Sequence, residues 1–237
     1  MHESVAKAIY KRHERVLTTQ YNRAAIQEKF NQLPNKRAAR IRAIPKVIDS
    51  IPNMVILSPY TEGKGKHATL SIMGLERGGD TNGRTAWYGF QMRYYARDFS
   101  VEHFGLPVVV THHAIQRVMQ RLGIAHPKKA IKALTPAIIG ALWLREPTDE
   151  AELLPMPEGA AIAVRDNLYP DCWAIVTFVD NAKLSYGQVQ EMAGSAMRIQ
   201  KVCDDFCVKE GIVAVSGDFS RPVEVKTGKR GPSIISL

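Results

Sequence analysis

Basic and imidazole side chains recur at a regular spacing between Thr111 and Gly123. His113, Arg117 and Arg121 are four residues apart, so a helix would place them along one side. Imidazole exchanges protons near neutral pH, and guanidinium binds phosphate oxygens through two parallel hydrogen bonds. These groups suit metal-independent cleavage of RNA, which needs acid–base help and stabilisation of a crowded phosphate.

The same residues also have a purely structural interpretation. Arginine on a solvated helix face is common, and histidine near a helix start is often a cap or a buried neighbour. Ile115, Val118 and Leu122 have the spacing that anchors such a helix to a core. His112 would point elsewhere, as a strand-end or packing residue. Spacing alone leaves both interpretations of the segment 111–122 open.

A short motif gives residues 108–180 a resemblance to a known group. The pattern His-Ala-x-x-Arg-x-x-x-Arg-x-Gly, followed by a second helix and two strands, resembles the barnase/colicin/RelE-like ribonuclease toxins. The resemblance implies a compact helix-plus-sheet nuclease that cleaves RNA without metal or cofactor. It implies an acid–base role for His113, phosphate contacts for Arg117 and Arg121, and a positioning hydroxyl at Thr177. An inhibitor or immunity protein is the protein partner that it implies.

Three departures from that group bear on activity more than on fold. Those toxins are usually near half this length, whereas the chain here has 237 residues. The stretch 124–159 is long and contains an extra apolar helix. The strands expected at 54–96 and the long C-terminal helix have no counterpart in the group.

The charge of the chain favours an anionic partner. The formal net charge is +9 and the isoelectric point about 9.5, which suits nucleic acid, with RNA favoured. Residues 1–50 hold eleven Lys or Arg and four acids, so +7 of the charge lies there. The residues expected to contact nucleic acid are Lys36, Arg37, Arg40, Arg42, Arg93 and Arg97.

An aromatic stretch at 86–96 allows two interpretations. Its rings alternate with Arg93 and are followed by Arg97, and a sheet face of that composition can stack unpaired bases. Alternatively, the rings belong to a core and the arginines are solvated, which is the commoner strand pattern.

Other site types lack a sequence signal. No phosphate-binding glycine loop, nucleophile elbow or His-Glu-x-x-His pair occurs. Cys172, Cys203 and Cys207 suit neither a disulfide framework nor a zinc site, so we expect no metal. Without a leader-like or membrane-spanning apolar run, we expect no membrane association and a cytoplasmic location, with delivery by a signal-less secretion route as the alternative.

The element order predicts an α+β fold with antiparallel sheet and flanking helices. A basic helical region at 1–50 is expected to comprise helices at 3–31 and 35–43, the second ending at Pro45. The core at 51–219 should contain a three-stranded meander at 54–96, with a hairpin turn at Asn82-Gly83. The remaining expected elements are a short apolar run at 106–110, helices at 111–122, from 127 and at 134–145, a loop at 146–158, strands at 160–165 and 172–179, a helix at 184–209 with an apolar seam, a last strand at 212–216 and a flexible basic tail at 220–237.

Three functions from different classes follow from these observations. The leading hypothesis is a nucleic-acid-directed enzyme, most concretely a metal-independent ribonuclease of toxin or effector type. The second is a non-enzymatic nucleic-acid- or protein-binding regulator of phage or mobile-element type, which would use the basic N-terminal helices. The third is a transferase that uses NAD, such as an ADP-ribosyltransferase.

Overall fold

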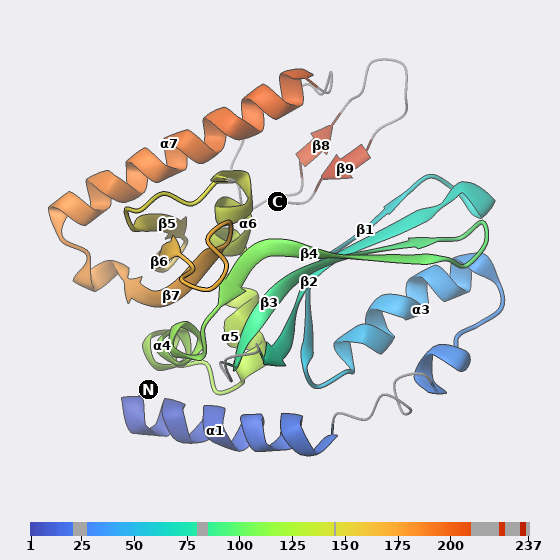
Figure 1. The fold of residues 1–237 in the computed structure, drawn as a ribbon, viewed down its shortest axis with the longest axis horizontal. Helices are drawn as coiled ribbons and strands as arrows, with labels where there is room; N and C mark the ends of the chain where they lie inside the picture. The colour runs from blue at the N-terminus through green and yellow to red at the C-terminus, as the bar shows by residue number, and fades with distance from the viewer. Residues whose placement is uncertain (21–27, 80–84, 145, 210–222, 226–232, 236–237) are drawn as a thin grey trace.

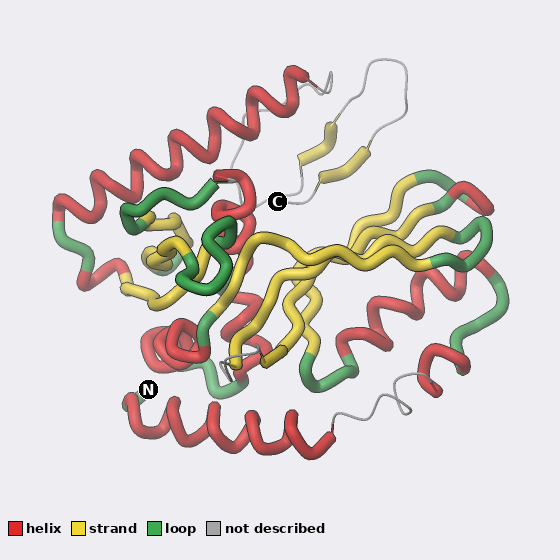
Figure 2. The backbone as a smooth tube through the Cα atoms, viewed as in Figure 1, coloured by secondary structure: helices red, strands yellow, loops and turns green. Residues whose placement is uncertain are grey.

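The protein has the α+β fold that the sequence predicts, with helices flanking a curled, mostly antiparallel sheet (Figures 1 and 2). A computed structural model describes residues 1–20, 28–79, 85–144, 146–209, 223–225 and 233–235. The seven-stranded sheet has the order β1-β2-β3-β4-β7-β6-β5, and only the pair β4–β7 is parallel. Its strands are β1 (Met54–Glu62), β2 (Thr69–Gly79), β3 (Thr85–Tyr95), β4 (Val101–Val110), β5 (Glu152–Met156), β6 (Gly159–Arg165) and β7 (Trp173–Asp180).

Helices cover parts of both faces of this sheet. They are α1 (Glu3–Gln20), α3 (Arg37–Asp49), α4 (His112–Leu122), α5 (Pro127–Ala133), α6 (Thr135–Leu144) and α7 (Tyr186–Lys209), with short 3-10 turns at Gly65–His67 and Asn181–Lys183. In Figure 1, α3 lies along one face of the long strands, whereas α1 and α4 lie at the opposite end of the sheet. A separate hairpin pairs β8 (Val223–Val225) with β9 (Ser233–Ile235).

Two clusters of buried side chains hold these layers together. The larger joins α1, α4, α5 and α6 to the middle strands and includes the fully buried Trp87 and Trp173. The smaller lies between α3 and the far half of β1–β3 and contains Ile44, Ile48 and Phe90. Burial of these apolar faces is the main source of their stability.

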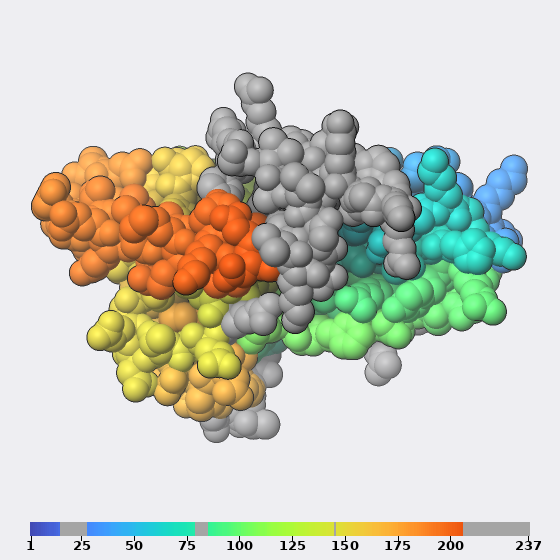
Figure 3. Space-filling model, turned by 90° about the horizontal axis from the view of Figure 1, so that it is seen from above, coloured from blue at the N-terminus to red at the C-terminus, as the bar shows by residue number. Residues whose placement is uncertain are grey.

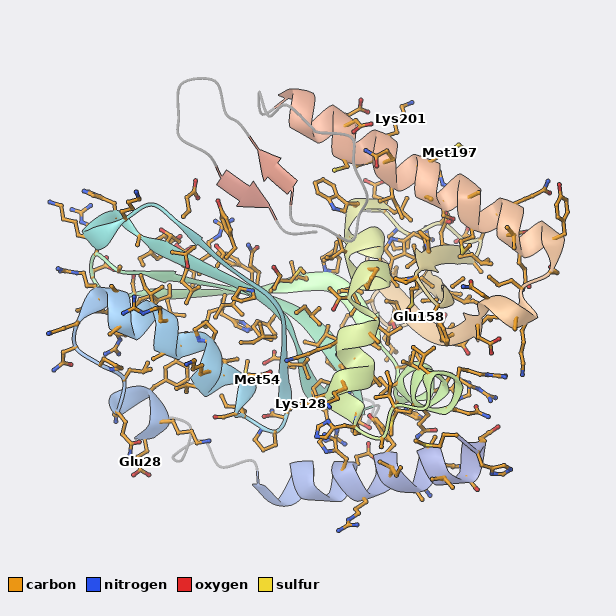
Figure 4. The ribbon with its side chains drawn as sticks, turned by 180° about the vertical axis from the view of Figure 1, so that it is seen from behind. Glu28, Met54, Lys128, Glu158, Met197 and Lys201 are labelled. Carbon is orange, nitrogen blue, oxygen red and sulfur yellow. The ribbon has the colours of Figure 1, made fainter. Side chains whose placement is uncertain are left out.

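Helix α3 continues beyond Pro45, where the sequence interpretation ended it. Proline removes one intrahelical hydrogen bond. Ile41, Ile44 and Ile48 are nevertheless buried against the sheet at helical spacing, and this packing outweighs the lost bond. Carbonyl groups at and just after the end of α3 also accept hydrogen bonds. The Lys128 ammonium donates to Asp49 O (2.7 Å) and Ile51 O (2.8 Å). Figure 4 shows Lys128 on α5, near Met54 at the start of β1.

Strand β4 is longer than the sequence predicts, and strand β5 was not predicted. β4 begins at Val101, although only 106–110 was predicted, because its first half has exposed side chains and pairs with β3 alone. β5 lies within the predicted loop 146–158. Its Pro155 is compatible with a strand because β5 is at the sheet edge.

The C-terminal helix α7 packs beside α6 and β5, and its apolar seam is less buried than predicted. Ile199 packs on the larger core, whereas Val189 is exposed. The turn at Asn82-Gly83, the strand expected at 212–216 and most of the tail from Ser220 lie outside the described residues. The antiparallel pairing of β2 with β3, up to Gly79 opposite Thr85, agrees with a hairpin between them.

Candidate functional site

Helix α4 presents its predicted polar side at the surface. Thr111 caps the helix by accepting a hydrogen bond from Ala114 N (3.2 Å), and Gly123 ends it with a left-handed φ of 67°. Ile115 and Val118 are buried as predicted, whereas His113 is exposed. The helix is therefore fixed by its apolar face, with the His113 imidazole at the surface.

His113 and Arg117 come together with a residue from the N-terminal helix α1. The Arg117 Nε donates to His113 Nε2 (3.4 Å), and its Nη1 pairs with Glu3 Oε2 (3.1 Å) and donates to Gln120 Oε1 (2.8 Å). Glu3 lies in the first turn of α1, which packs beside α4. We call Glu3, His113 and Arg117 the α4 cluster. A carboxylate, a guanidinium and an imidazole are the groups that acid–base chemistry at a phosphate requires.

Arg121 is directed to a different partner. Its Nη1 lies 3.5 Å from Asp180 Oδ2 at the end of β7, and both side chains are mostly buried. This ion pair ties α4 to the sheet and removes Arg121 from the α4 cluster.

Thr177 does not join the α4 cluster either. The neighbouring Phe178 is buried in the core beneath α4. Successive side chains of a strand point to opposite faces, so Thr177 faces away from α4. The hydroxyl near this helix is instead that of Thr111, which donates to Val176 O (3.3 Å).

The surroundings of His113 favour its neutral form. Partial burial, the Arg117 guanidinium and His112 lower its pKa from the ordinary value, with only Glu3 acting in the opposite direction. A neutral imidazole near pH 7 can accept a proton from a substrate hydroxyl. His112 is also exposed, and its ring centroid lies 6.3 Å from that of Tyr10.

A second candidate region lies on the far half of β1–β4, on the face opposite α3. Cross-strand register places its side chains in rows: Tyr60, Ser71, Arg93 and Glu102 form one, and Ser58, Met73, Gln91 and Phe104 the next. These side chains are half-buried or exposed, whereas the other face of the same strands is buried under α3. Figure 3 views the molecule from this side, with β1 and β2 in cyan and β4 in green. We call this surface the open face, including Glu62, Thr69 and Tyr95.

The open face carries aromatic rings and a guanidinium in contact. The Arg93 guanidinium lies over the Phe104 ring, 5.7 Å from its centroid, and Phe104 is 44% exposed. Beside them, the Tyr95 hydroxyl donates to Glu102 Oε2 (2.6 Å), and this hydrogen bond raises the pKa of Tyr95. Of the rings in 86–96, Trp87, Phe90 and Tyr94 are buried, so the core interpretation holds for them, whereas Tyr95 and Arg93 belong to the open face.

Most of the predicted nucleic-acid contacts gather at one end of the sheet, on α3 and on the turn that joins β3 to β4. Arg37 and Arg40 of α3 stack on Phe99, at 5.8 and 5.3 Å from its centroid, and the Arg37 Nε donates to Ala96 O (2.8 Å). Phe99 is 42% exposed and has a positive φ of 63°, uncommon for a residue with a side chain. The side chains of Lys36, Arg42 and Arg97 are exposed. We call this group, Lys36, Arg37, Arg40, Arg97 and Phe99, the basic end.

Strand β4 separates the basic end from the α4 cluster. It begins at Val101, beside Phe99, and finishes at Val110, two residues before α4. At about 3.3 Å per residue, the two regions are about 30 Å apart. A nucleic-acid strand would have to run along the molecule to contact both.

Sequence reasoning missed several residues that the fold brings to these regions. Glu3 and Asp180 are far from α4 in sequence, and no local pattern pairs them with Arg117 or Arg121. Phe104 lies in a segment that lacked a strand signal. The sequence shows the alternating positions of Tyr60 and Glu62 and of the arginines along their strands. Only the strand register shows that these residues share one face of the sheet.

The described residues contain no group of three or more His, Cys, Asp or Glu side chains placed to hold a metal ion. None of the described helices combines the length and apolar character needed to cross a bilayer. Comparison with family models, curated proteins and solved structures finds no match for this chain.

Proposed function

We propose that this protein binds single-stranded nucleic acid, with RNA favoured, over the open face and the adjoining basic end. The observation that carries the proposal is the exposed pair of Arg93 and Phe104 on a sheet face that also carries Tyr60, in the cross-strand row of Arg93, and Tyr95, in the adjacent row. Exposed rings on a sheet stack unpaired bases, and guanidinium groups add cation–π and phosphate contacts.

The positions of the exposed cations favour a bound nucleic-acid strand that extends beyond the open face. The exposed Lys36 and Arg97, with the Arg37–Arg40 pair on Phe99, provide cations at the end of the sheet that borders the open face. Rings would hold the bases while these side chains neutralise phosphates. A duplex buries its bases, so it would use the cations but not the rings.

The test is to replace Phe104→Ala and measure binding of a labelled single-stranded RNA by fluorescence anisotropy. Loss of one stacked base should weaken binding roughly 5- to 150-fold, the equivalent of about 1–3 kcal/mol. Binding should also weaken steeply with salt, and neutralising Lys36 and Arg97 together should reduce the slope of log K against log salt by about 1.4, at about 0.7 for each phosphate contact.

Tyr186→Ala is the matched control, because Tyr186 is an exposed ring (79%) at the start of α7, away from the open face. It should bind as the unaltered protein does. Equal affinity of the Phe104→Ala protein, or tighter binding of duplex than of single-stranded RNA, would contradict the proposal.

A second candidate function is cleavage of RNA at the α4 cluster. It is favoured by the contacts of Arg117 with both His113 and Glu3, and by the resemblance of residues 108–180 to the ribonuclease toxins. In this proposal one of Glu3 and His113 takes the proton of the 2′-hydroxyl, the other protonates the leaving oxygen, and Arg117 binds the phosphate.

Cleavage is tested with His113→Ala and Glu3→Gln in a fluorogenic RNA assay. Each change should lower the rate roughly 100- to 10,000-fold, the range of general acid–base contributions, and EDTA should have no effect. His112→Ala is the comparison, since His112 makes no hydrogen bond in the cluster and acts on His113 only by lowering its pKa; its loss should shift the pH profile without abolishing cleavage. Undiminished cleavage by the His113→Ala protein, or inhibition by EDTA, would exclude this mechanism.

A further inference from the structure

The open face contains a hollow large enough for a nucleobase. Its volume is about 560 Å³, and its lining includes Tyr60, Glu62, Ser71, Gln91, Arg93 and Tyr95 from β1, β2 and β3. Sites for small ligands occupy about 300–1,000 Å³. The lining also includes the small side chains of Ser58, Thr69 and Ser71.

The charges in the lining have opposite signs on opposite sides. Glu62 is on β1 in the row of Thr69 and Tyr95, and Arg93 is on β3 in the next row, opposite Ser71. Two strand spacings and two residues separate them, which places their Cα atoms about 12 Å apart. Their side chains can therefore reach the two ends of one planar group lying between them.

The Glu62 carboxylate restricts the chemistry of the ligand that the hollow can bind. A site that bound only phosphate would be weakened by Glu62, because like charges repel. The group facing Glu62 must therefore present N–H donors, and the group facing Arg93 must present acceptors or negative charge.

Guanine meets both requirements within one ring system. Its N1–H and 2-amino group are adjacent donors that match the two oxygens of a carboxylate. Its O6 and N7 are adjacent acceptors that arginine binds with two hydrogen bonds. Uracil offers one N–H between two carbonyls, and adenine and cytosine place a ring acceptor beside their amino group, which a carboxylate repels.

We propose that the hollow binds an unpaired guanine base of the single strand, with Glu62 accepting hydrogen bonds from N1–H and the 2-amino group and Arg93 donating to O6 and N7. Tyr60 and Tyr95 are then the rings nearest to the base. This assignment rests on the proposed function and adds to it a base preference.

The experiment uses the full chain and labelled oligouridine carrying one central guanosine, adenosine or inosine. Inosine keeps N1–H, O6 and N7 but lacks the 2-amino group. The guanosine oligonucleotide should bind about tenfold more tightly than the adenosine one, the lower part of the range for one bidentate contact. Inosine should fall between them.

Glu62→Gln is the decisive variant, because it keeps the size of the side chain and removes the charge. It should lose most of the guanosine-over-inosine difference while oligouridine still binds. Glu191→Gln is the control, an exposed carboxylate on α7, and should keep the full preference. Thermal melting of both variants checks that they are folded.

The outcomes separate the two proposals. Binding of all oligonucleotides with equal affinity, or a preference for another base, overturns the guanine assignment and leaves single-strand binding in place. A guanosine preference that persists in the Glu62→Gln protein also overturns it. Absence of binding to every oligonucleotide would overturn both.

Discussion

The two arginines of α4 differ in how readily a phosphate could replace their carboxylate partners. Arg117 pairs with Glu3, whose side chain is 61% exposed, whereas Arg121 pairs with Asp180, which is 22% exposed. Exposed ion pairs contribute only about 0–1 kcal/mol, so an entering phosphate can displace Glu3 at little cost. Removing Asp180 from Arg121 would leave a mostly buried carboxylate unpaired. Arg117 is therefore the phosphate ligand if the α4 cluster is catalytic.

A pH dependence of stability follows from His13. Its ring contacts His126 of the neighbouring loop (centroids 5.5 Å apart), and its Nε2 is buried with no hydrogen-bond partner among the described residues. Burial, followed by the nearby His126, Lys128 and Arg77, lowers the pKa of His13 to about 4. The unfolded value is about 6.5, so the folded state disfavours the protonated form.

His13 is therefore neutral in both states above pH 6.5 and does not lower the free energy of unfolding there. That free energy falls as the pH drops from 6.5 toward 4, because only the unfolded state then binds the proton readily. Near pH 5, unfolding should take up about one proton at His13. Urea midpoints measured at pH 7.5 and 4.5 should fall less in a His13→Gln protein than in the unaltered one. An identical fall in both proteins would show that His13 does not titrate on unfolding.

At the level of elements, the sequence predicts those with a strong periodic pattern and misses those that depend on a partner. The helix at 111–122, the meander and the long C-terminal helix were all predicted. The first half of β4 and all of β5 were not, because edge strands need few apolar residues and tolerate proline. For the same reason, α4 and its exposed His113 could be predicted, whereas Glu3 could not, since only the packing of α1 on α4 brings it there.

The pairing of β3 with β4 depends on one small residue. A Cβ on Gly89 would lie 2.6 Å from Val108 Cγ1 and 2.9 Å from Leu106 Cβ, where the register of β4 shifts. Gly89→Ala should therefore lower the free energy of unfolding by about 1–3 kcal/mol, the usual effect of overpacking.

Gly105→Ala provides the comparison, because a Cβ there meets nothing within 4 Å. It should change the free energy of unfolding by no more than about 0.5 kcal/mol. Urea denaturation of the two variants measures both values. A Gly89→Ala protein as stable as the Gly105→Ala protein would mean that β4 can shift to accommodate the methyl group.

At the level of the whole molecule, the basic N-terminal residues are part of the packed structure. Ala6 and Tyr10 of α1 are buried in the larger core, and Tyr10 accepts a hydrogen bond from Trp87 Nε1 (3.3 Å). Ile41 and Ile44 of α3 are buried in the smaller core. Deleting residues 1–46 would therefore expose both cores, so substitution of exposed cations is the appropriate way to test the role of charge.

The single parallel pair in the sheet has a consequence for how the chain folds. β1–β4 and β5–β7 each pair with near neighbours in sequence, whereas Val108 and Trp173, which begin the β4–β7 pairing, are 65 residues apart and only three residue pairs join these strands. Contacts of high sequence separation form late because closing a long loop costs entropy. The two antiparallel halves are thus expected to assemble first, and their junction, with α4 capped onto β7 through Thr111, to complete the native state.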